Sequence, residues 1–542
     1  MLSDNDFQNE YHFNNNRNIR LPLYLTLAFI VGALMTFYLL SPRHTILKPS
    51  SNNKFETVLD YLEAVYVDTI NREQLTEEAI NAMLQYLDPH SVYVNAQENK
   101  LMMESLDGEF EGVGIQYSVM NDTVMVIATI SGGPSEKVGV RAGDRIVTVN
   151  DSNIAGVGIG NNDVVRLLRG PKGTKVNVGI RRQGFAELYS YTITRAEIPT
   201  YTVDVDYMID SKTGYVKINQ FGKTTGDEFE AALKRLNAKG MQKLILDLRG
   251  NSGGYLETCI RVCDELLKKN ELIVYTEGRN VKTDKIYATR YGHFEQGDLV
   301  VLIDDFSASA SEIVAGCVQD NDRGTIVGRR SFGKGLVQRQ VDFDDNSSVR
   351  LTIARYHTPS GRCIQKTYVN GAVAYNEELF DRYLNGEMEH QDSIKFDENL
   401  KYKTKNGRTV YGGGGIMPDI FVPLDRDSSM NDFYLIVNSG KMYNFAFDYT
   451  TENSAKLKKR FPNAESFVKN MTVDESLFKS FMDYYNKVSD KKCEKTVTKA
   501  SEKELKVWLK AFIGRNLYQD AAFYPVINST DKVIEAAMKV KK

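Results

Sequence analysis

The sequence has few of the residues that stabilise small secreted domains or bind metals. Its 542 residues include five cysteines, six histidines and one tryptophan. The cysteines are too few and too scattered for a disulfide framework. Cys259 and Cys263 lie four residues apart without a matching pair of ligands, so we interpret them as thiols of a hydrophobic core. We expect neither a metal nor a cofactor.

An excess of basic residues is also missing. The formal net charge is -3 and the isoelectric point is near 6.2, so the chain lacks the positive field that holds a phosphate backbone, and nucleic acid is not an expected partner. The residues that are present, 42% hydrophobic and 26% charged, can bury several cores. The length predicts about three or four domains.

Residues 21–40 form an uncharged apolar stretch of twenty residues, enough to cross the hydrocarbon core of a bilayer as a helix. The stretch is long for a signal peptide, and no small-x-small cleavage pattern follows it. We therefore predict an uncleaved membrane anchor at 21–40, with residues 1–20 as a short cytoplasmic tail.

Four regions with different patterns follow the anchor. Residues 45–106 have apolar residues at helical spacing, which predicts a helical region. Residues 107–198 have short β-rich runs separated by glycine turns. Residues 200–428 alternate between strands and helices, which predicts an α/β layer fold with its chemistry at strand-to-helix turns. The remainder, 429–542, is charged and helically patterned, and we predict a helical C-terminal appendage without chemistry.

The β-rich region resembles a PDZ domain over nearly its whole length. Gly112, Val113, Gly114 and Ile115 open it, and glycines allow backbone amides to point into one concavity, which suits a peptide carboxylate. Arg169 ends a short amphipathic helix of this region and is a candidate link between bound peptide and the active site. The alternatives are a small β-barrel that only spaces other domains and, for Arg169, a solvated surface arginine.

Two strand-to-turn transitions compete for a nucleophile. The segment from Gly250 to Gly254 formally fits the Gly-x-Ser-x-Gly elbow of α/β-hydrolases, with Ser252 as the nucleophile. Its base would be a downstream histidine. The available ones are His293, His357 and His390.

The second candidate is the serine-rich turn of residues 306–313, which leads into a helix whose N-terminal amides can stabilise an oxyanion. Lys334, between two glycines, is a candidate base, but it must be neutral, which requires burial and a lowered pKa. Gln338 could hold its amine by a hydrogen bond. Considered alone, Lys334 fits an ordinary surface lysine better than a base, and spacing does not choose among Ser307, Ser309 and Ser311.

These motifs together resemble the carboxyl-terminal processing proteases, also called tail-specific proteases. The resemblance runs from about residue 54 to 425, including the turn at 87–91 and the PDZ segment. The other matching segments, in family order, are 247–254, 307–313, 331–338, 356–362 and 412–419, with Asp320 and Gly328. The fold that this implies is a layered, crotonase-like α/β protease core with a preceding or inserted PDZ domain.

The resemblance implies a serine endopeptidase with a Ser-Lys dyad. Carried onto this chain, Ser309 attacks, Lys334 is the base and Gln338 positions the lysine. Gly253 or Gly254, with the amide of Ala310, would form the oxyanion hole. The family usually has proline where this chain has Ser252, so that serine is dispensable on this interpretation.

The expected substrates are exported, partly unfolded proteins with free C-termini, bound by the PDZ domain. The implied location is a bacterial inner membrane, spanned once, with the protease in the periplasm or cell envelope; homo-oligomers are a further expectation. Two alternatives remain at this stage, a catalytically idle PDZ scaffold and an α/β-hydrolase that uses Ser252.

Overall fold

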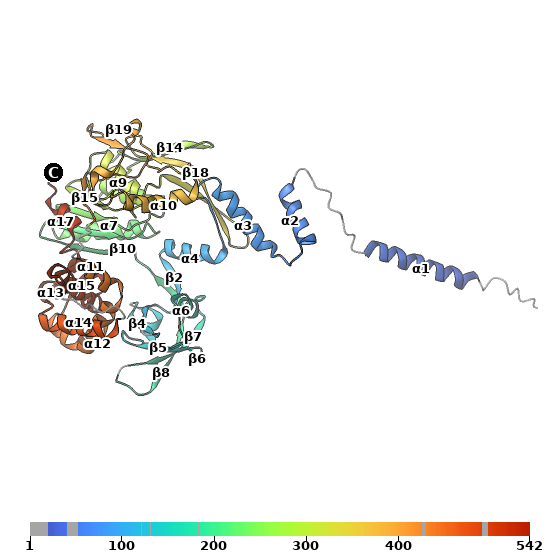
Figure 1. The fold of residues 1–542 in the computed structure, drawn as a ribbon, viewed down its shortest axis with the longest axis horizontal. Coiled ribbons are helices and arrows are strands. Elements are labelled where there is room, and N and C mark those ends of the chain that lie inside the picture. The colour runs from blue at the N-terminus through green and yellow to red at the C-terminus, as the bar shows by residue number, and fades with distance from the viewer. Residues whose placement is uncertain are drawn as a thin grey trace, which may run out of the picture. The chain divides into compact units, whose positions relative to one another are not determined.

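The computed structural model describes residues 20–40, 53–120, 122–130, 132–182, 184–424, 430–489 and 497–541. The chain divides into two compact units, residues 1–80 and 81–542. Figure 1 shows the helices and strands of both units in chain order.

The N-terminal unit is helical. α1 (Arg20–Leu40), α2 (Lys54–Val65) and the start of α3 (Arg72–Gln85) belong to it. The guanidinium of Arg72 joins α2 and α3 through three carboxylates of α2, those of Glu56, Asp60 and Glu63, at 2.7 to 2.8 Å.

The predicted anchor at 21–40 is helical but is not supported as a membrane span. Across the part of the chain that the structure describes, no helix has both the length and the apolar character that crossing a membrane requires. Residues 1–19 of the predicted tail lie outside the described residues.

The PDZ domain, residues 109–199, is built on a sheet of order β3-β4-β5-β7-β8, with β6 (Ser152–Asn153) beside β5. Its strands are β3 (Ile115–Val119), β4 (Val124–Thr129), β5 (Arg145–Val149), β7 (Lys175–Arg181) and β8 (Leu188–Thr194). The short helix α5 (Pro134–Val138) and α6 (Asn161–Leu168) complete it. β2 (Glu109–Gly112) and β9 (Ala196–Pro199) pair antiparallel where the chain enters and leaves the domain. The predicted β-rich domain is therefore present.

The protease core contains a six-stranded sheet of order β10-β11-β12-β15-β16-β21. The strands are β10 (Val203–Met208), β11 (Thr213–Ile218), β12 (Lys243–Asp247), β15 (Asp298–Ile303), β16 (Thr325–Gly328) and β21 (Ile420–Phe421). All neighbours are parallel except β10 and β11. Crossover helices α7 (Thr225–Ala238), α8 (Leu256–Leu266) and α9 (Ala310–Asp320) share one hydrophobic core with the sheet. The predicted alternation of strands and helices is therefore confirmed.

A second sheet carries the lysine-bearing loop. Its order is β1-β18-β13-β14, with β17 also paired to β18. The strands are β1 (Val92–Val94), β13 (Leu272–Gly278), β14 (Val281–Tyr287), β17 (Leu336–Asp342) and β18 (Ser348–His357). α4 (Ala96–Asp107) follows β1, and α10 (Gly371–Leu384) lies beyond β18 in the chain. The small strands β19 (Lys401–Lys403) and β20 (Thr409–Tyr411) pair with each other.

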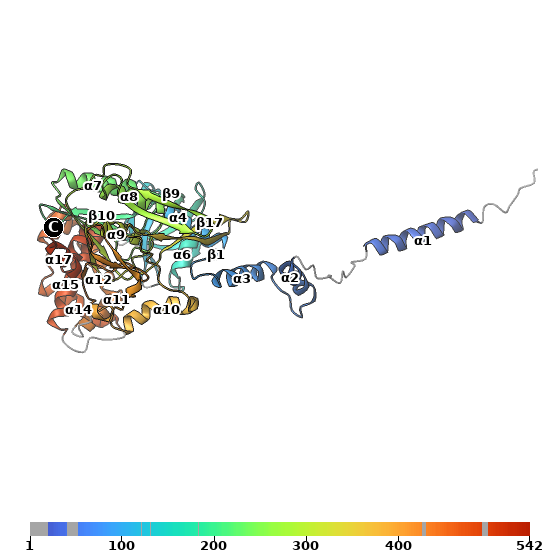
Figure 2. The same cartoon turned by 90° about the horizontal axis from the view of Figure 1, so that it is seen from above.

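The other face of the six-stranded sheet is covered by the end of the chain. α17 (Lys532–Lys539) packs Val533, Ile534 and Ala537 against buried side chains of the sheet. A mostly parallel sheet must be covered on both faces. α17 covers the second face, so it is part of the protease core and does not belong to a separate appendage. In both Figure 1 and Figure 2 the red C-terminal helices lie near β10.

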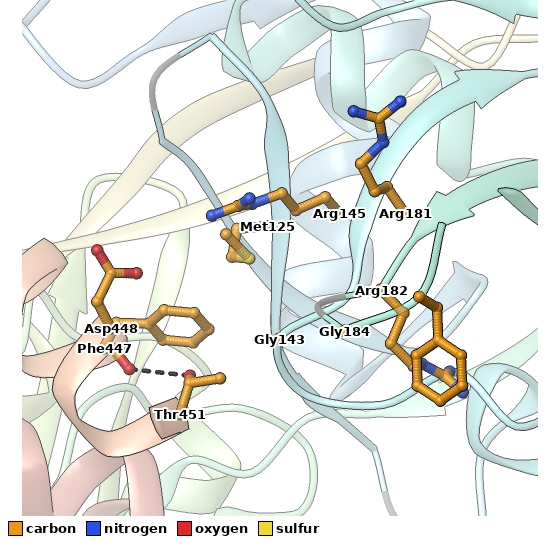
Figure 3. Close-up of a pocket in the computed structure, with 10 residues that line it drawn as sticks. Met125, Gly143, Arg145, Arg181, Arg182, Gly184, Phe447, Asp448 and Thr451 are labelled. Atoms are coloured by element: carbon orange, nitrogen blue, oxygen red, sulfur yellow. Dashed lines mark hydrogen bonds between the residues drawn. The ribbon is translucent and has the colours of Figure 1, made fainter. Parts of the chain in front are cut away.

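The C-terminal bundle, residues 431–527, lies between the PDZ domain and the core sheet. It consists of α11 (Asn431–Asn438), α12 (Lys441–Arg460), α13 (Ala464–Asn470), α14 (Glu475–Val488), α15 (Lys499–Tyr518) and α16 (Asp520–Ile527). α16 packs against β10. Phe447 of α12 packs with Met120 and Met125 of the PDZ domain, and Figure 3 shows Phe447 and Met125 facing each other. The bundle therefore contacts both other domains.

We expect Lys243→Met to destabilise the protein by about 1 to 3 kcal/mol. The ammonium group of Lys243 is buried and donates to the carbonyls of Ala537 (2.7 Å), Met538 (3.1 Å) and Val540 (2.7 Å) at the end of α17. Methionine would remove this donor from all three carbonyls, of which that of Ala537 keeps the N–H of Val540 at 3.2 Å. Differential scanning calorimetry checks this, with the exposed Lys239→Met as the control. Equal unfolding temperatures for both variants would show that this cap does not stabilise α17.

Candidate active site

Ser309 lies at the turn between β15 and α9, in a strained backbone conformation. Its φ of 54° and ψ of -112° are unusual for a residue with a side chain. Ala310, the first residue of α9, follows it, and its N–H has no hydrogen-bond acceptor among the described residues. The turn thus places a serine next to a free amide at a helix N-terminus, where an oxyanion is stabilised.

The hydroxyl groups of the three candidate serines have different surroundings. Ser307 donates to the carbonyl of Leu248 at 2.8 Å, and Ser311 donates to the carbonyl of Asn251 at 2.9 Å. Both serines are fully buried, whereas Ser309 is half-buried. Within the described ranges no hydrogen bond involves the hydroxyl of Ser309. Ser307 and Ser311 therefore join two loops, and Ser309 is left available to react.

The glycine loop, residues 250–254, packs directly against this turn. A Cβ on Gly253 would lie 2.8 Å from the Cβ of Ser309 and 3.1 Å from the nitrogen of Ala310. Gly253 has a φ of 106° and Gly254 a φ of 144°, both suited to glycine. A Cβ on Gly254 would lie 2.1 Å from the carbonyl oxygen of Phe221. Neither position accepts a larger residue.

The two glycines differ in their backbone N–H groups. Gly253 donates to Oδ1 of Asn251 at 2.9 Å, so its N–H is already engaged. The N–H of Gly254 has no acceptor among the residues that the structure describes. Of the two glycines left open by the sequence, Gly254 is therefore the better partner for Ala310 in an oxyanion hole.

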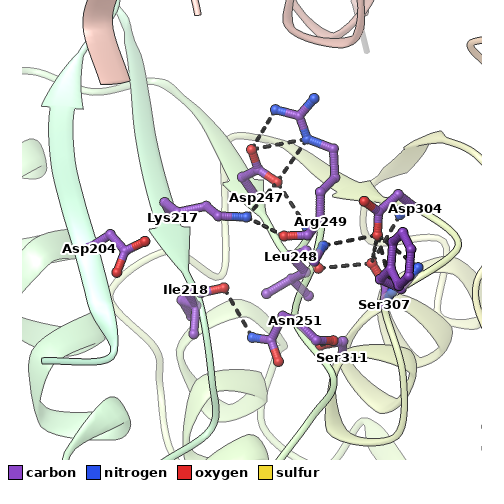
Figure 4. A network of polar contacts seen from close by, with 12 residues as sticks. Asp204, Lys217, Ile218, Asp247, Leu248, Arg249, Asn251, Asp304, Ser307 and Ser311 are labelled. Atoms are coloured by element: carbon purple, nitrogen blue, oxygen red, sulfur yellow. Dashed lines mark hydrogen bonds and ion pairs between the residues drawn. The ribbon is translucent and has the colours of Figure 1, made fainter. Parts of the chain in front are cut away.

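A buried charge network supports the start of the glycine loop. Asp247, fully buried, contacts Arg249 at 2.6 Å and Lys217 at 3.5 Å, as Figure 4 shows. Burial alone would raise the pKa of Asp247, but the two cations outweigh it and hold that pKa below its usual range. Arg249 also pairs with Asp531, the N-cap of α17, at 2.7 Å. The last helix thus helps to fix the residue that precedes the loop.

Glu312 connects the candidate nucleophile to the candidate base. It lies in the first turn of α9 and is fully buried. Its Oε2 accepts hydrogen bonds from the N–H groups of Ser309 (2.9 Å) and Lys334 (2.8 Å). Its Oε1 accepts from the hydroxyl of Ser331 (2.5 Å) and the N–H of Gly333 (2.7 Å). Burial raises the pKa of Glu312, and these four donors oppose the rise.

Tyr356 of β18 provides a second connection. Its hydroxyl is shared between the carbonyl oxygens of Lys334 at 2.7 Å and Ser309 at 3.2 Å. The side chain is buried, and burial raises its pKa, so the phenol stays protonated and donates. Glu312 therefore binds the N–H groups of Ser309 and Lys334, and Tyr356 binds the carbonyl oxygens of the same two residues.

The ammonium group of Lys334 lies in an environment that favours its neutral form. Burial lowers its pKa, and the guanidinium of Arg350 lowers it further, whereas Glu312 and Asp88 act in the opposite direction. A lowered pKa is what a lysine base requires. Within the described part of the chain, Lys334 Nζ makes no hydrogen bond to Ser309, and catalytic hydrogen bonds are often long in ligand-free proteins.

Gln338 does not contact Lys334 in this structure. Its side-chain nitrogen donates to the carbonyl oxygen of His90. His90 belongs to a turn held by the buried Asp88, which accepts from the amides of His90 and Ser91. Burial, together with the charge of Lys334, lowers the pKa of His90 to about 4, so its imidazole is neutral at pH 7. The role of Gln338 in positioning the lysine stays a prediction.

The glycine-rich PDZ loop lies at the open edge of its sheet. The N–H groups of Val113 and Gly114 have no acceptor among the described residues, and Ile115 begins β3. Gly112 ends β2. Arg169 directly follows α6; its guanidinium lies 4.5 Å from the centre of the Phe110 ring and pairs with Glu104 of α4. Arg169 thus contacts a helix of the neighbouring domain and is not a free surface arginine.

The groups that an α/β-hydrolase would need are not together. Ser252 is exposed, and within the described residues it makes no hydrogen bond to a histidine. His293 bonds to Glu265 at 2.7 Å, and His357 stacks on Tyr275. The hydrolase alternative therefore has no assembled site.

The cysteines and the acidic residues form no metal centre in the described part of the chain. Cys259, Cys263 and Cys317 are buried in the main core, and the structure describes no group of three or more metal-ligating side chains that could hold an ion. Cys493 lies outside the described residues.

Four residues of the site were missed by sequence reasoning: Glu312, Tyr356, Arg350 and Asp88. Glu312, Asp88 and Tyr356 stood inside segments that were singled out. An acidic residue near a helix start, such as Glu312, is usually a cap, and Asp88 belongs to a turn. Tyr356 and Arg350 lie on β18, and no local pattern shows that a strand residue faces a distant loop.

We expect Glu312→Gln to destabilise the fold by about 3 kcal/mol and to remove most activity. Glutamine has one acceptor oxygen for four donors, and its NH₂ group would face N–H groups. Thermal unfolding and peptide cleavage check this, with the exposed Glu257→Gln as the matched control. A Glu312→Gln variant as stable and as active as this control would contradict the role given to the carboxylate.

Four segments of the chain match known protein families. Residues 212–374 match Peptidase family S41, residues 126–182 match the PDZ domain family, and residues 41–98 match the N-terminal domain of the activating protease CtpB. Residues 433–519, within the C-terminal bundle, match a family of unknown function, DUF8443.

Similar proteins cover most of the chain. A carboxy-terminal-processing protease of Bartonella bacilliformis is 33% identical over 432 residues, 77% of this chain and 96% of that protein. The carboxy-terminal processing protease CtpA of Bacillus subtilis is 31% identical over 455 residues, 77% of this chain and 97% of that protein.

Among solved structures, the photosystem II D1 C-terminal processing protease is 26% identical and matches 68% of this chain and 86% of its own, with a TM-score of 0.35. The PDZ domain of a carboxy-terminal protease from Vibrio cholerae, solved with a peptide, is 30% identical over 17% of this chain and 97% of its own, with a TM-score of 0.16. The identities to whole curated relatives and the S41 match show that this chain belongs to the carboxy-terminal processing proteases of peptidase family S41.

Proposed function

We propose that this protease cleaves exported, partly unfolded proteins near their C-termini through an acyl-enzyme on Ser309, with Lys334 as the base. The observation that carries the proposal is the carboxylate of Glu312, which bonds to the N–H groups of Ser309 and Lys334 at once. Burying a carboxylate is costly unless hydrogen bonds offset the loss of solvation. The hydrogen bonds that offset it here also fix the positions of the two loops.

The proposed reaction needs only the dyad, two backbone amides and water. Lys334, neutral, accepts the proton of Ser309 while the serine oxygen attacks the peptide carbonyl. The negative charge that develops on the carbonyl oxygen faces the N–H groups of Gly254 and Ala310. Lys334 then gives the proton to the leaving amine. A water molecule, losing its proton to Lys334, attacks the ester carbonyl, and return of that proton to the serine oxygen releases the acid.

Substrate binding is proposed to begin at the PDZ domain. The N–H groups of Val113 and Gly114 are free to bind a C-terminal carboxylate, and the unpaired edge of β3 can accept the peptide as an added strand. Arg169 is the candidate connection from this groove to the core. It pairs with Glu104 of α4, and Asp107 at the end of α4 accepts a hydrogen bond from Tyr255, which follows the glycine loop.

The idle-scaffold alternative gives no reason for a serine in a strained turn beside a desolvated lysine. An inner-membrane location, with the protease in the periplasm or cell envelope, and homo-oligomers stay predictions from the sequence and its resemblance.

Replacement of the dyad separates the remaining alternatives. We expect Ser309→Ala and Lys334→Met each to reduce cleavage of an unstructured protein by about 10³-fold or more, because each removes a reacting group. Ser252→Ala, on the exposed side of the glycine loop, should retain activity. Mass spectrometry of the products measures the rates. Loss of activity in Ser252→Ala with retention in Lys334→Met would support the hydrolase interpretation instead.

Activity should rise with pH through the pKa of Lys334. Below that pKa the lysine is protonated and cannot accept the serine proton. Because Arg350 lowers the pKa of Lys334, Arg350→Gln should raise it and move the ascending limb of kcat/KM to higher pH. The exposed Arg339→Gln on the adjacent strand is the matched control. An unmoved limb in Arg350→Gln would show that Lys334 is not the group that titrates.

A further inference from the structure

A cavity of about 450 Å³ lies between the PDZ domain and the C-terminal bundle. On the PDZ side it is lined by β3 and β4, including Gln116 and Ser118. On the bundle side it is lined by α12, α15 and the start of α16, including Tyr443, Arg515 and Asn516. Most of its lining side chains are polar, which suits a hydrogen-bonding ligand rather than an apolar one.

The cavity adjoins the edge where the proposed peptide would add to the sheet. β3 is the terminal strand of its sheet, and Tyr117 bonds through its hydroxyl to Asn161 at the start of α6. Side chains alternate along a strand, so Gln116 and Ser118 face the opposite side, away from α6. Ser118 pairs with Met125, and Met125 packs on Phe447 of the bundle. The side chains of Gln116 and Ser118 therefore lie on the face of the sheet that is turned toward the bundle.

An added peptide strand has the same alternation. With its carboxylate at the amides of Val113 and Gly114, the peptide runs antiparallel to β3. Its last residue and the third from the end then point toward α6, and the penultimate and fourth-from-last residues point toward the side of Gln116 and Ser118. The cavity therefore lies where these two side chains would go.

Two groups in the cavity wall lack hydrogen-bond partners among the described residues. One is Oδ1 of Asp520, and the other is the side-chain amide of Asn516 on α15, whose Oδ1 and Nδ2 are both buried. The amide of Asn516 has to turn toward the cavity to reach a ligand. The neighbouring charges are balanced, since Arg515 lies 3.2 Å from the carboxylate of Asp520. A buried amide without partners is costly, and a ligand that offers one donor and one acceptor would satisfy it.

We propose that the C-terminal bundle is part of the substrate site and that Asn516 selects side-chain amides at the penultimate and fourth-from-last positions of the bound C-terminus. This inference rests on the proposed binding of C-termini by the PDZ domain. It gives the bundle a function in specificity, in addition to its packing on the core.

The test is peptide binding to the full chain carrying Ser309→Ala, which prevents cleavage. Two labelled ten-residue peptides differ only at the penultimate and fourth-from-last positions, with Gln at both or Met at both, and fluorescence anisotropy gives each Kd. We expect the Gln peptide to bind about tenfold more tightly, the effect of a pair of net hydrogen bonds. Adding Asn516→Leu should abolish the difference, and adding the exposed Asn470→Leu should leave it unchanged.

Equal Kd values for the two peptides, or a preference that survives Asn516→Leu, would overturn the role of Asn516 while leaving the proposed function standing. If both peptides bind no better than their C-terminally amidated forms, the proposed capture of C-termini fails as well. Asn516→Leu should unfold at the same temperature as the parent or higher, because it removes a buried amide without partners. A large loss of stability would show instead that Asn516 supports the bundle.

Discussion

The carboxylate of Glu312 is the interaction on which the rest of the site depends. It is fully buried and satisfied by four donors, two of which are the backbone N–H groups of Ser309 and Lys334. Ser309 lies between β15 and α9, and Lys334 lies in the loop from β16 to β17, so a group placed between the two loops helps to fix their separation. Tyr356 does the same for their carbonyls. Two polar side chains thereby join the loops that carry the proposed nucleophile and the proposed base.

The chain ends contribute more to this site than their sequence positions suggest. α17, at the C-terminus, covers the second face of the core sheet and pairs through Asp531 with Arg249, next to the glycine loop. Before it, the C-terminal bundle packs on the PDZ domain through Phe447. The bundle therefore contacts both the domain proposed to capture substrate and the core sheet, through α16 and β10.

The main domains could be predicted from sequence because local motifs indicate them, whereas the reacting residues stay a prediction from the resemblance. Alternation of apolar strands and helices indicated the α/β core, and the resemblance selected Ser309 and Lys334. Sequence spacing could not choose Ser309 over Ser307 and Ser311, since that depends on which hydroxyls reach the carbonyls of another loop. The sequence also could not show where α17 packs, because an apolar helix face does not indicate which sheet it covers. The choice of Gly254 over Gly253 required the position of the Asn251 side chain.

Ser309, Lys334 and two backbone amides are proposed to form one reaction centre. A crystal structure of the full chain with a peptide aldehyde, which forms a covalent hemiacetal with a nucleophilic serine, tests it most directly. The account predicts a bond from the aldehyde carbon to Ser309 Oγ, the hemiacetal oxygen between the N–H groups of Gly254 and Ala310, and Lys334 Nζ within hydrogen-bond distance of Ser309 Oγ. An adduct on Ser252, or an oxygen directed away from these amides, would contradict it.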